Sequence, residues 1–170
     1  WYVKKKIRDN KNLEIYLPKK VYNEIDISSV NANIDYQGST ESSCMNLKLE
    51  SVSGDILLNQ ITTKNLKIEN VSGNINIIDV QSDKEIEIDS VSGNLNAEQV
   101  ETNNLEVDTV SSKINISGII NNIELDCVSS DIDLTMYVAP KLINCDTVSG
   151  NVKLLLPENE GFMATLDSVS

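Results

Sequence analysis

The chain has 170 residues and a formal net charge of −12, with 26 acidic residues, 14 basic residues and no histidine. Such an acidic chain repels phosphate backbones, so nucleic acid is not an expected partner. The absence of histidine excludes Ser-His and Cys-His nucleophile systems and histidine-bearing metal sites.

Residues 1–12 are predicted to form a terminal segment in front of the folded domain. They begin with Trp1-Tyr2-Val3-Lys4-Lys5-Lys6. Aromatic residues followed by lysines are typical of the interfacial end of a membrane helix, so we expect a juxtamembrane segment with an anchor before Trp1. A frayed basic terminus is the alternative explanation. No apolar run in the chain itself is long enough for a transmembrane helix.

A tripeptide then returns throughout residues 13–170. Val-Ser-Gly occurs four times and Val-Ser-Ser twice, and the chain also holds a degenerate first copy and a truncated last one. A period near 20 that tolerates insertions of one or two residues predicts a stack of like units. The valines that mark successive units are Val30, Val52, Val71, Val91, Val110, Val128, Val148 and Val169.

Within each unit, apolar and polar residues alternate. If the valine is counted as position zero, positions −5, −3, +4 and +6 are almost all apolar, and the residues between them are polar. Strict alternation predicts β-strands with one buried face, and the spacings of three and four that a helix needs are absent. The predicted fold is therefore all-β: a single-domain parallel β-solenoid over residues 13–170, with about seven coils of roughly 18–22 residues.

The alternation slips by one residue at the valine, which predicts a bend between two strands. We expect the valine and the residue at +2, such as Val71 and Gly73, to face inward there, with the serine facing outward. Glycine at +2 suits a tight corner. Further apolar residues, nine or ten positions after the valine, are expected to point inward from a short third side: Ile61, Val80, Val100, Ile119 and Val138.

The position two before the valine is acidic in almost every unit. Stacked carboxylates about 5 Å apart repel one another, which raises some pKa values or recruits a cation such as calcium. A solvated face that keeps the rod soluble is the favoured alternative, because no single unit supplies six ligands and the calcium-binding nonapeptide is missing. We therefore predict no metal and no cofactor, and the candidate stripe is Glu69, Asp89, Asp108, Asp126 and Asp146.

Two further columns are polar. Asn and Asp at +3 and +5 predict hydrogen-bonded ladders, or else a flat face for a glycan or another protein. Small, mostly hydroxylic residues at −1 predict hydrogen bonds across the corner, and ice binding is the rejected alternative. A β-helix polysaccharide lyase or hydrolase would need one coil with clustered Asp, Lys and Arg, and none is found. We predict no catalytic residue and no enzyme.

The three cysteines are not predicted to form a disulfide. Cys145 lies in an apolar column and is expected in the core. Cys127 lies one coil earlier, with a Cα separation of about 8 Å that is too long for a bridge. Cys44 is assigned to the longest loop.

The units that follow the pattern Leu-x-Ile/Val-x-x-Val-Ser-Gly-Asn/Asp-Ile/Leu-x-Ile/Leu are clearest at residues 66–77 and 86–95. Over residues 13–170 they resemble the bacterial adhesin-like β-strand-repeat domains of the DUF4097 family. Val110 and Val128 depart from the motif because no glycine follows them. The resemblance implies a β-solenoid and a bacterial cell-envelope setting, and it carries over no catalytic or binding residue.

Two functional hypotheses follow. The first is a non-enzymatic β-solenoid of the cell envelope, extracellular or membrane-anchored, that acts as an adhesin, surface scaffold or binding module toward a protein or glycan surface. The second is an assembly module on the cytoplasmic face, which the three lysines favour if a membrane helix precedes them, because basic flanks stay inside. A glycan-processing β-helix enzyme is a third. Because Ser170 lies midway through a unit, we also expect end-to-end self-association through an open edge.

Overall fold

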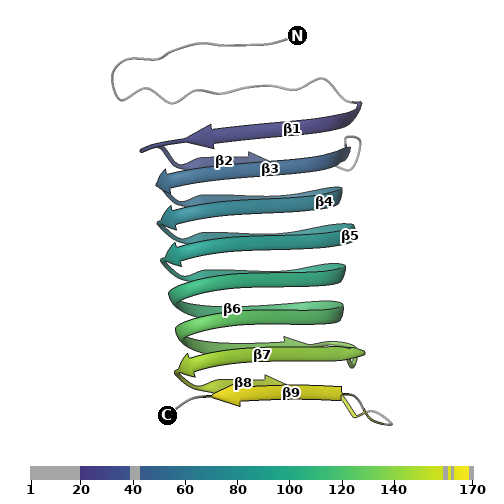
Figure 1. The fold of residues 1–170 in the computed structure, drawn as a ribbon. Helices are drawn as coiled ribbons and strands as arrows, with labels where there is room; N and C mark the ends of the chain where they lie inside the picture. The colour runs from purple at the N-terminus through teal and green to yellow at the C-terminus, as the bar shows by residue number, and fades with distance from the viewer. Residues whose placement is uncertain (1–19, 39–42, 159–160, 162, 169–170) are drawn as a thin grey trace.

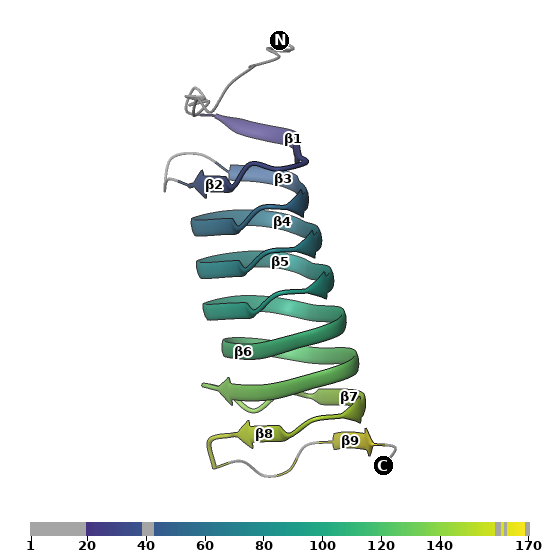
Figure 2. The same cartoon turned by 90° about the vertical axis from the view of Figure 1, so that its left-hand side faces the viewer.

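The computed structural model describes residues 20–38, 43–158, 161 and 163–168, which form one all-β rod. Its strands are stacked along the rod in Figures 1 and 2. This confirms the predicted parallel β-solenoid, while residues 1–12 lie outside the described part. The strands are β1 (Val21–Ser29), β2 (Ile34–Gln37), β3 (Ser43–Ser53), β4 (Ile56–Ser72), β5 (Ile75–Ser92), β6 (Leu95–Met136), β7 (Leu142–Ser149), β8 (Val152–Leu155) and β9 (Met163–Ser168).

Successive coils pair in parallel, and equivalent positions lie on one another. The strand order is β1-β3-β4-β5-β6-β7-β9, with β2 paired to β4 and β8 to β6. Leu66 lies between Leu47 of the previous coil and Ile86 of the next. Register shifts between Thr63 and Asn65 and between Ser82 and Glu85 absorb the differences in coil length. The near-20 period therefore corresponds to one turn of the solenoid.

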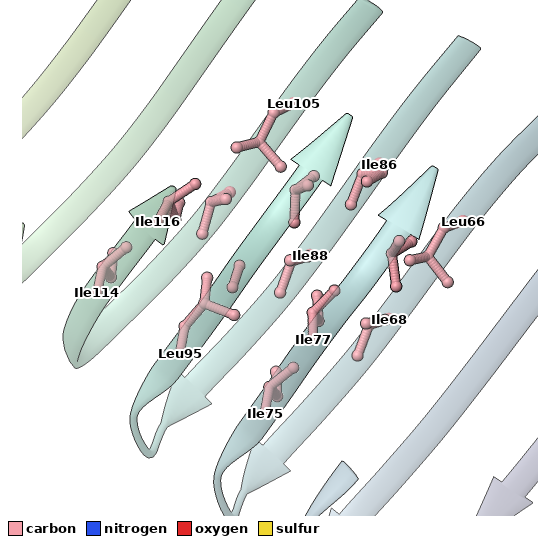
Figure 3. Packing of buried hydrophobic residues seen from close by; sticks show 14 of the residues in the cluster. Leu66, Ile68, Ile75, Ile77, Ile86, Ile88, Leu95, Leu105, Ile114 and Ile116 are labelled. Atoms are coloured by element: carbon pink, nitrogen blue, oxygen red, sulfur yellow. The ribbon is translucent and has the colours of Figure 1, made fainter. Parts of the chain in front are cut away.

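The core consists of rows of aliphatic side chains that run from coil to coil (Figure 3). The predicted inward columns are confirmed in the central coils, since Leu49, Ile56 and Ile77 are each 0% exposed. In the end coils they are less covered: Ile25 and Val152 are half-buried, and Ala164 is exposed. The third side is also confirmed for Ile61, Val80 and Val100, which are 1–3% exposed. Burying one such side chain contributes about 1.5–3 kcal/mol, so the rows supply most of the stabilisation.

The prediction for the third side is wrong in the later coils, where Ile119 is 38% and Val138 is 52% exposed. In the earlier coils the residue at +8 has a left-handed backbone, as Gln60 shows with φ 55°, and the alternation slips there by one residue. In the two later coils of β6, which begin at Ile114 and Ile132, the alternation continues without that slip. Ile120 and Met136 therefore face inward instead, at 1% and 3% exposure.

The inward placement of the repeat valine is also wrong. Val52, Val71, Val91, Val110, Val128 and Val148 are 47–50% exposed. The strand alternation continues through the valine, so that −5, −3 and −1 face inward while −4, −2 and zero face outward. The chain turns only afterwards, with valine and serine as two successive outward residues. The slip follows the valine in the Val-Ser-Gly and Val-Ser-Ser units alike: Gly73 makes the turn with φ 126°, whereas Ser112 and Ser130 stand at the same position without a positive φ.

Hydrogen bonds across this corner explain the small polar residues beside it, as predicted. Asn70 Nδ2 donates to the Gly73 carbonyl oxygen at 2.9 Å, and Thr109 Oγ1 and Ser112 Oγ hydrogen-bond at 2.6 Å. The serine of the tripeptide joins neighbouring coils, since Ser72 Oγ donates to the Val52 carbonyl oxygen at 3.1 Å. Val-Ser-Gly is thus an architectural motif of the corner.

The cysteines are buried free thiols. Cys145 lies in the core as predicted, at 1% exposure, and burial raises its pKa to about 11. The loop assignment of Cys44 is wrong, because it lies in β3 at 4% exposure. A thiol with a raised pKa stays protonated at neutral pH and is a poor nucleophile.

Candidate functional site

The acidic positions form one line on the outer face of the long strands. Glu69 pairs in register with Asp89, and Asp89 with Asp108. Asp126 pairs with Asp146 farther along the rod. Positions −4, −2 and zero share this outer face because side chains alternate along each strand. Each coil therefore presents a residue at −4, a carboxylate and a valine side by side.

Two lysines at position −4 neutralise the beginning of the acidic column. Lys48 Nζ forms ion pairs with Glu50 and, at 3.4 Å, with Glu69. Lys67 Nζ lies 3.2 Å from a Glu69 carboxylate oxygen and 3.4 Å from an Asp89 oxygen, and it also pairs with Glu87. The Lys67 ammonium group lowers the pKa of Glu69. Sequence reasoning missed these lysines, although their spacing of two residues from the carboxylates places them on the same face.

In the coils after Lys67, position −4 no longer carries a lysine. Position −4 is occupied by Glu87, Glu106 and Glu124 in successive units. Burial raises the pKa of Asp108, and the nearby Asp126 and Asp89 raise it further. Burial and then Asp108 raise the pKa of Glu106 in the same way. Negative charge on this face is therefore greatest in the three coils that carry these glutamates.

The carboxylates of the candidate stripe do not surround a common point. Within the described ranges, no group of three or more acidic or cysteine side chains is arranged to hold a metal ion. In-register stacking spaces one column residue from the next by about 4.8 Å, the distance between strands. Stacking thus produces a line of charge along the rod instead of a cage.

A shallow groove of about 880 Å³ runs beside this line and crosses six coils from Ser28 to Asp126. One wall is the acidic column, and the other is the row of exposed valines. The small residues at −1 lie between them. Sequence reasoning missed the groove because it placed the valines inside. The residues of its central coils are Glu69, Asn70, Val71, Asp89, Ser90, Val91, Asp108, Thr109 and Val110.

The amide-rich column at +3 is satisfied within the rod. Asp55 Oδ1 accepts a hydrogen bond from the backbone N–H of Asn74 at 2.7 Å, and Asn74 Oδ1 accepts one from the N–H of Asn94 at 3.1 Å. Asp131 Oδ1 accepts one hydrogen bond from the backbone N–H of Asn151 and one from its side-chain Nδ2, and both lower the pKa of the Asp131 carboxyl. The predicted ladders are confirmed at +3, whereas at +5 Lys153 Nζ lies 3.5 Å from an Asp133 carboxylate oxygen. We take the groove as the candidate binding surface.

The family model described as Toastrack DUF4097 matches residues 2–170 of the chain. The chain belongs to the Toastrack family. No curated protein and no solved structure matches it. The Toastrack domain is a scaffold-like β-solenoid, in which a regular core carries repeated surface columns. In the part that the structure describes, it contains no helix long and apolar enough to cross a membrane.

Proposed function

We propose that this Toastrack domain is a non-enzymatic scaffold that holds a partner along the side of its rod. The observation that carries the proposal is the groove, which crosses six coils instead of lying within one. A surface built from equivalent positions of successive coils offers a partner a long row of repeated contacts. Catalysis instead requires unlike groups that converge on one reacting atom, and the carboxylates here are spread along a line.

The setting that we propose is the cell envelope, where the domain would act as an extracellular or membrane-anchored adhesin or surface scaffold. The aromatic and lysine residues of the segment Trp1-Tyr2-Val3-Lys4-Lys5-Lys6 support a nearby membrane. A protein partner is favoured over a glycan, because sugar sites use exposed aromatic platforms. Tyr137, at 52% exposure, lies outside the groove.

Protease treatment of intact cells that express the full-length protein tests the setting. A domain on the outside should be digested before lysis, while a cytoplasmic control protein survives. Protection of the domain until lysis would contradict the envelope proposal and would favour the assembly module on the cytoplasmic face.

A glycan array combined with a hydrolysis screen tests the non-enzymatic part. The purified domain should release no product from any polysaccharide, with a known polysaccharide lyase as the positive control. Turnover that Asp108→Asn and Asp126→Asn abolish would overturn the scaffold proposal and support the glycan-processing enzyme.

End-to-end association remains part of the proposal. Sheet edges pair readily with a second chain when nothing covers them. We expect sedimentation velocity to show a species larger than the monomer, whose share grows with protein concentration. A single monomeric boundary at all concentrations would contradict this.

A further inference from the structure

The row of exposed valines is an apolar surface that the core does not explain. Val52, Val71, Val91, Val110, Val128 and Val148 are each 47–50% exposed and recur once per coil. Single exposed apolar residues are ordinary, but a contiguous apolar patch marks an interaction site in many soluble proteins. We call these six residues the valine row; Val52, Val71, Val91 and Val110 of this row line the groove, together with Val30 of the first coil.

The wall opposite the valine row is anionic. Lys48 and Lys67 pair with the first carboxylates, whereas Asp108 and Asp126 have glutamates beside them at position −4. A partner that fills the groove must therefore be apolar on one flank and cationic on the other. Charge complementarity would also orient it, with its most basic end toward the later coils.

The spacing of the coils distinguishes between two shapes of polypeptide. The coils recur about every 4.8 Å, while an extended strand presents residues on one face about every 6.7 Å. An α-helix advances about 5.4 Å per turn. Four coil spacings cover about 19 Å, and four helical turns are longer than this by only about 2–3 Å. The residues on one face of an extended strand fall behind the valines by about 2 Å at every coil, because their spacing is wider than that of the coils. A helix along the rod thus presents roughly one turn to each valine.

We propose that the groove binds a cationic amphipathic α-helix of a partner protein. The apolar stripe of the helix would contact the valine row, and its Lys or Arg flank would face the acidic column. The six-coil groove, about 24 Å long by coil spacing, accommodates about 16 helical residues. The inference rests on the proposed scaffold function and specifies the chemistry of its partner. The alternative is that the stacked valines only stabilise one another.

A designed peptide of about 16 residues tests the proposal, with leucines at helical spacing and lysines along one flank. Fluorescence anisotropy with the intact domain should show saturable binding that weakens at high salt, and circular dichroism should show a gain of helix on binding. A peptide with glutamate in place of lysine should not bind. A scrambled peptide of the same composition should bind about tenfold more weakly, because it lacks the apolar stripe. Equal binding of the scrambled peptide would show simple charge attraction and overturn the proposal.

Variants of the domain locate the site. The triple variant V71T/V91T/V110T keeps β-branched side chains and should bind the lysine peptide about tenfold more weakly. Val138→Thr is the matched control, since Val138 is 52% exposed away from the groove. D108N/D126N should also weaken binding, in contrast to D83N/E101Q, which removes two exposed carboxylates elsewhere.

Melting curves should show that the four variants remain folded. Equal affinity of the groove and control variants, or failure of the lysine peptide to bind wild-type protein, would overturn the helix proposal. A loss of stability in V71T/V91T/V110T without a loss of affinity would show that the valine row is only structural. None of these results would affect the protease and hydrolysis tests of the scaffold function, so the two proposals can fail separately.

Discussion

Gly73 shows how closely successive coils approach each other at the first corner. Its φ of 126° is a conformation that residues with a side chain rarely adopt, and a Cβ atom there would overlap with the Gly54 carbonyl oxygen. Both features follow from a turn that stacks backbone directly on backbone. Val-Ser-Ser coils avoid this conformation, because β6 runs through Ser112 and Ser130 without a break.

We expect Gly73→Ala to lower the free energy of unfolding by about 2–4 kcal/mol, through backbone strain together with steric overlap. Gly161→Ala is the control. Its φ of 132° is similar, but a Cβ atom there meets nothing within 4 Å. The control should therefore cost only the strain, about 1–2 kcal/mol. Urea denaturation measures both, and equal losses would contradict the role of the close approach.

At the scale of the element, the outer face of the long strands combines attraction and repulsion. Lys48 and Lys67 in β3 and β4 bridge carboxylates of neighbouring coils. Exposed ion pairs of this kind contribute little individually, but they remove repulsion within the stack. In β6, Glu106 and Asp108 lack that compensation, and burial first and then the neighbouring carboxylates raise their pKa values. The excess of carboxylates over lysines on this face favours solubility and would attract the cationic partner that we propose.

A pH profile of stability follows from these shifts. The pKa values of Glu106 and Asp108 are raised above 4.5 and 3.8. The folded state therefore binds protons more readily than the unfolded state, and stability should rise as the pH falls from neutral toward about 4.5. The lowered pKa values of Glu69 and Asp131 act oppositely, so stability should be lost at still lower pH.

In the double variant E106Q/D108N, stability should increase less as the pH falls from neutral toward about 4.5. At pH 7 the variant should melt at a higher temperature than wild-type protein, because two repelling carboxylates are removed. E98Q/E101Q, which changes two exposed acids on another side of the coil, should retain the wild-type profile. Thermal melts followed by circular dichroism from pH 3 to pH 8 provide the measurement. An unchanged rise in E106Q/D108N would assign the effect to other groups.

At the scale of the whole molecule, the rod is a one-dimensional stack in which each coil contacts its neighbours. β4 pairs with β3 and β5, and β5 pairs with β4 and β6. Stability in such a stack is close to a sum over coils and their interfaces. The length of the binding surface can therefore change without a change of fold, which suits a scaffold.

Deletion of residues 71–90 removes one whole coil and joins Asn70 to Val91 in the same phase of the repeat. We expect a folded, shorter rod with a cooperative melt at a somewhat lower temperature. Deletion of residues 71–80 removes half a coil and breaks the columns, so cooperative melting should be lost. Equal melting behaviour of the two deletions would contradict the stacking of equivalent positions.

The fold class, the coil length and most of the core can be predicted from the amino-acid sequence. These follow from local patterns, because period-two alternation defines strands and the near-20 period brings equivalent positions into contact. The alternation alone thus places Ile56, Ile77 and Leu49 in the core, where each is 0% exposed. The acidic column could be placed outside for the same reason, since it alternates with the column at −3.

The positions at which the alternation slips are visible only in the folded structure, and the candidate site depends on them. The backbone angles at Gly73 and Gln60 set the two corners, and the apolar character of a valine cannot reveal them. When the slip is displaced by one residue, Val71 lies on the surface instead of in the core. In the same way, Ile120 instead of Ile119 faces the core. The groove exists only between columns of stacked coils, so it arises from contacts between residues of successive coils that are far apart in the sequence.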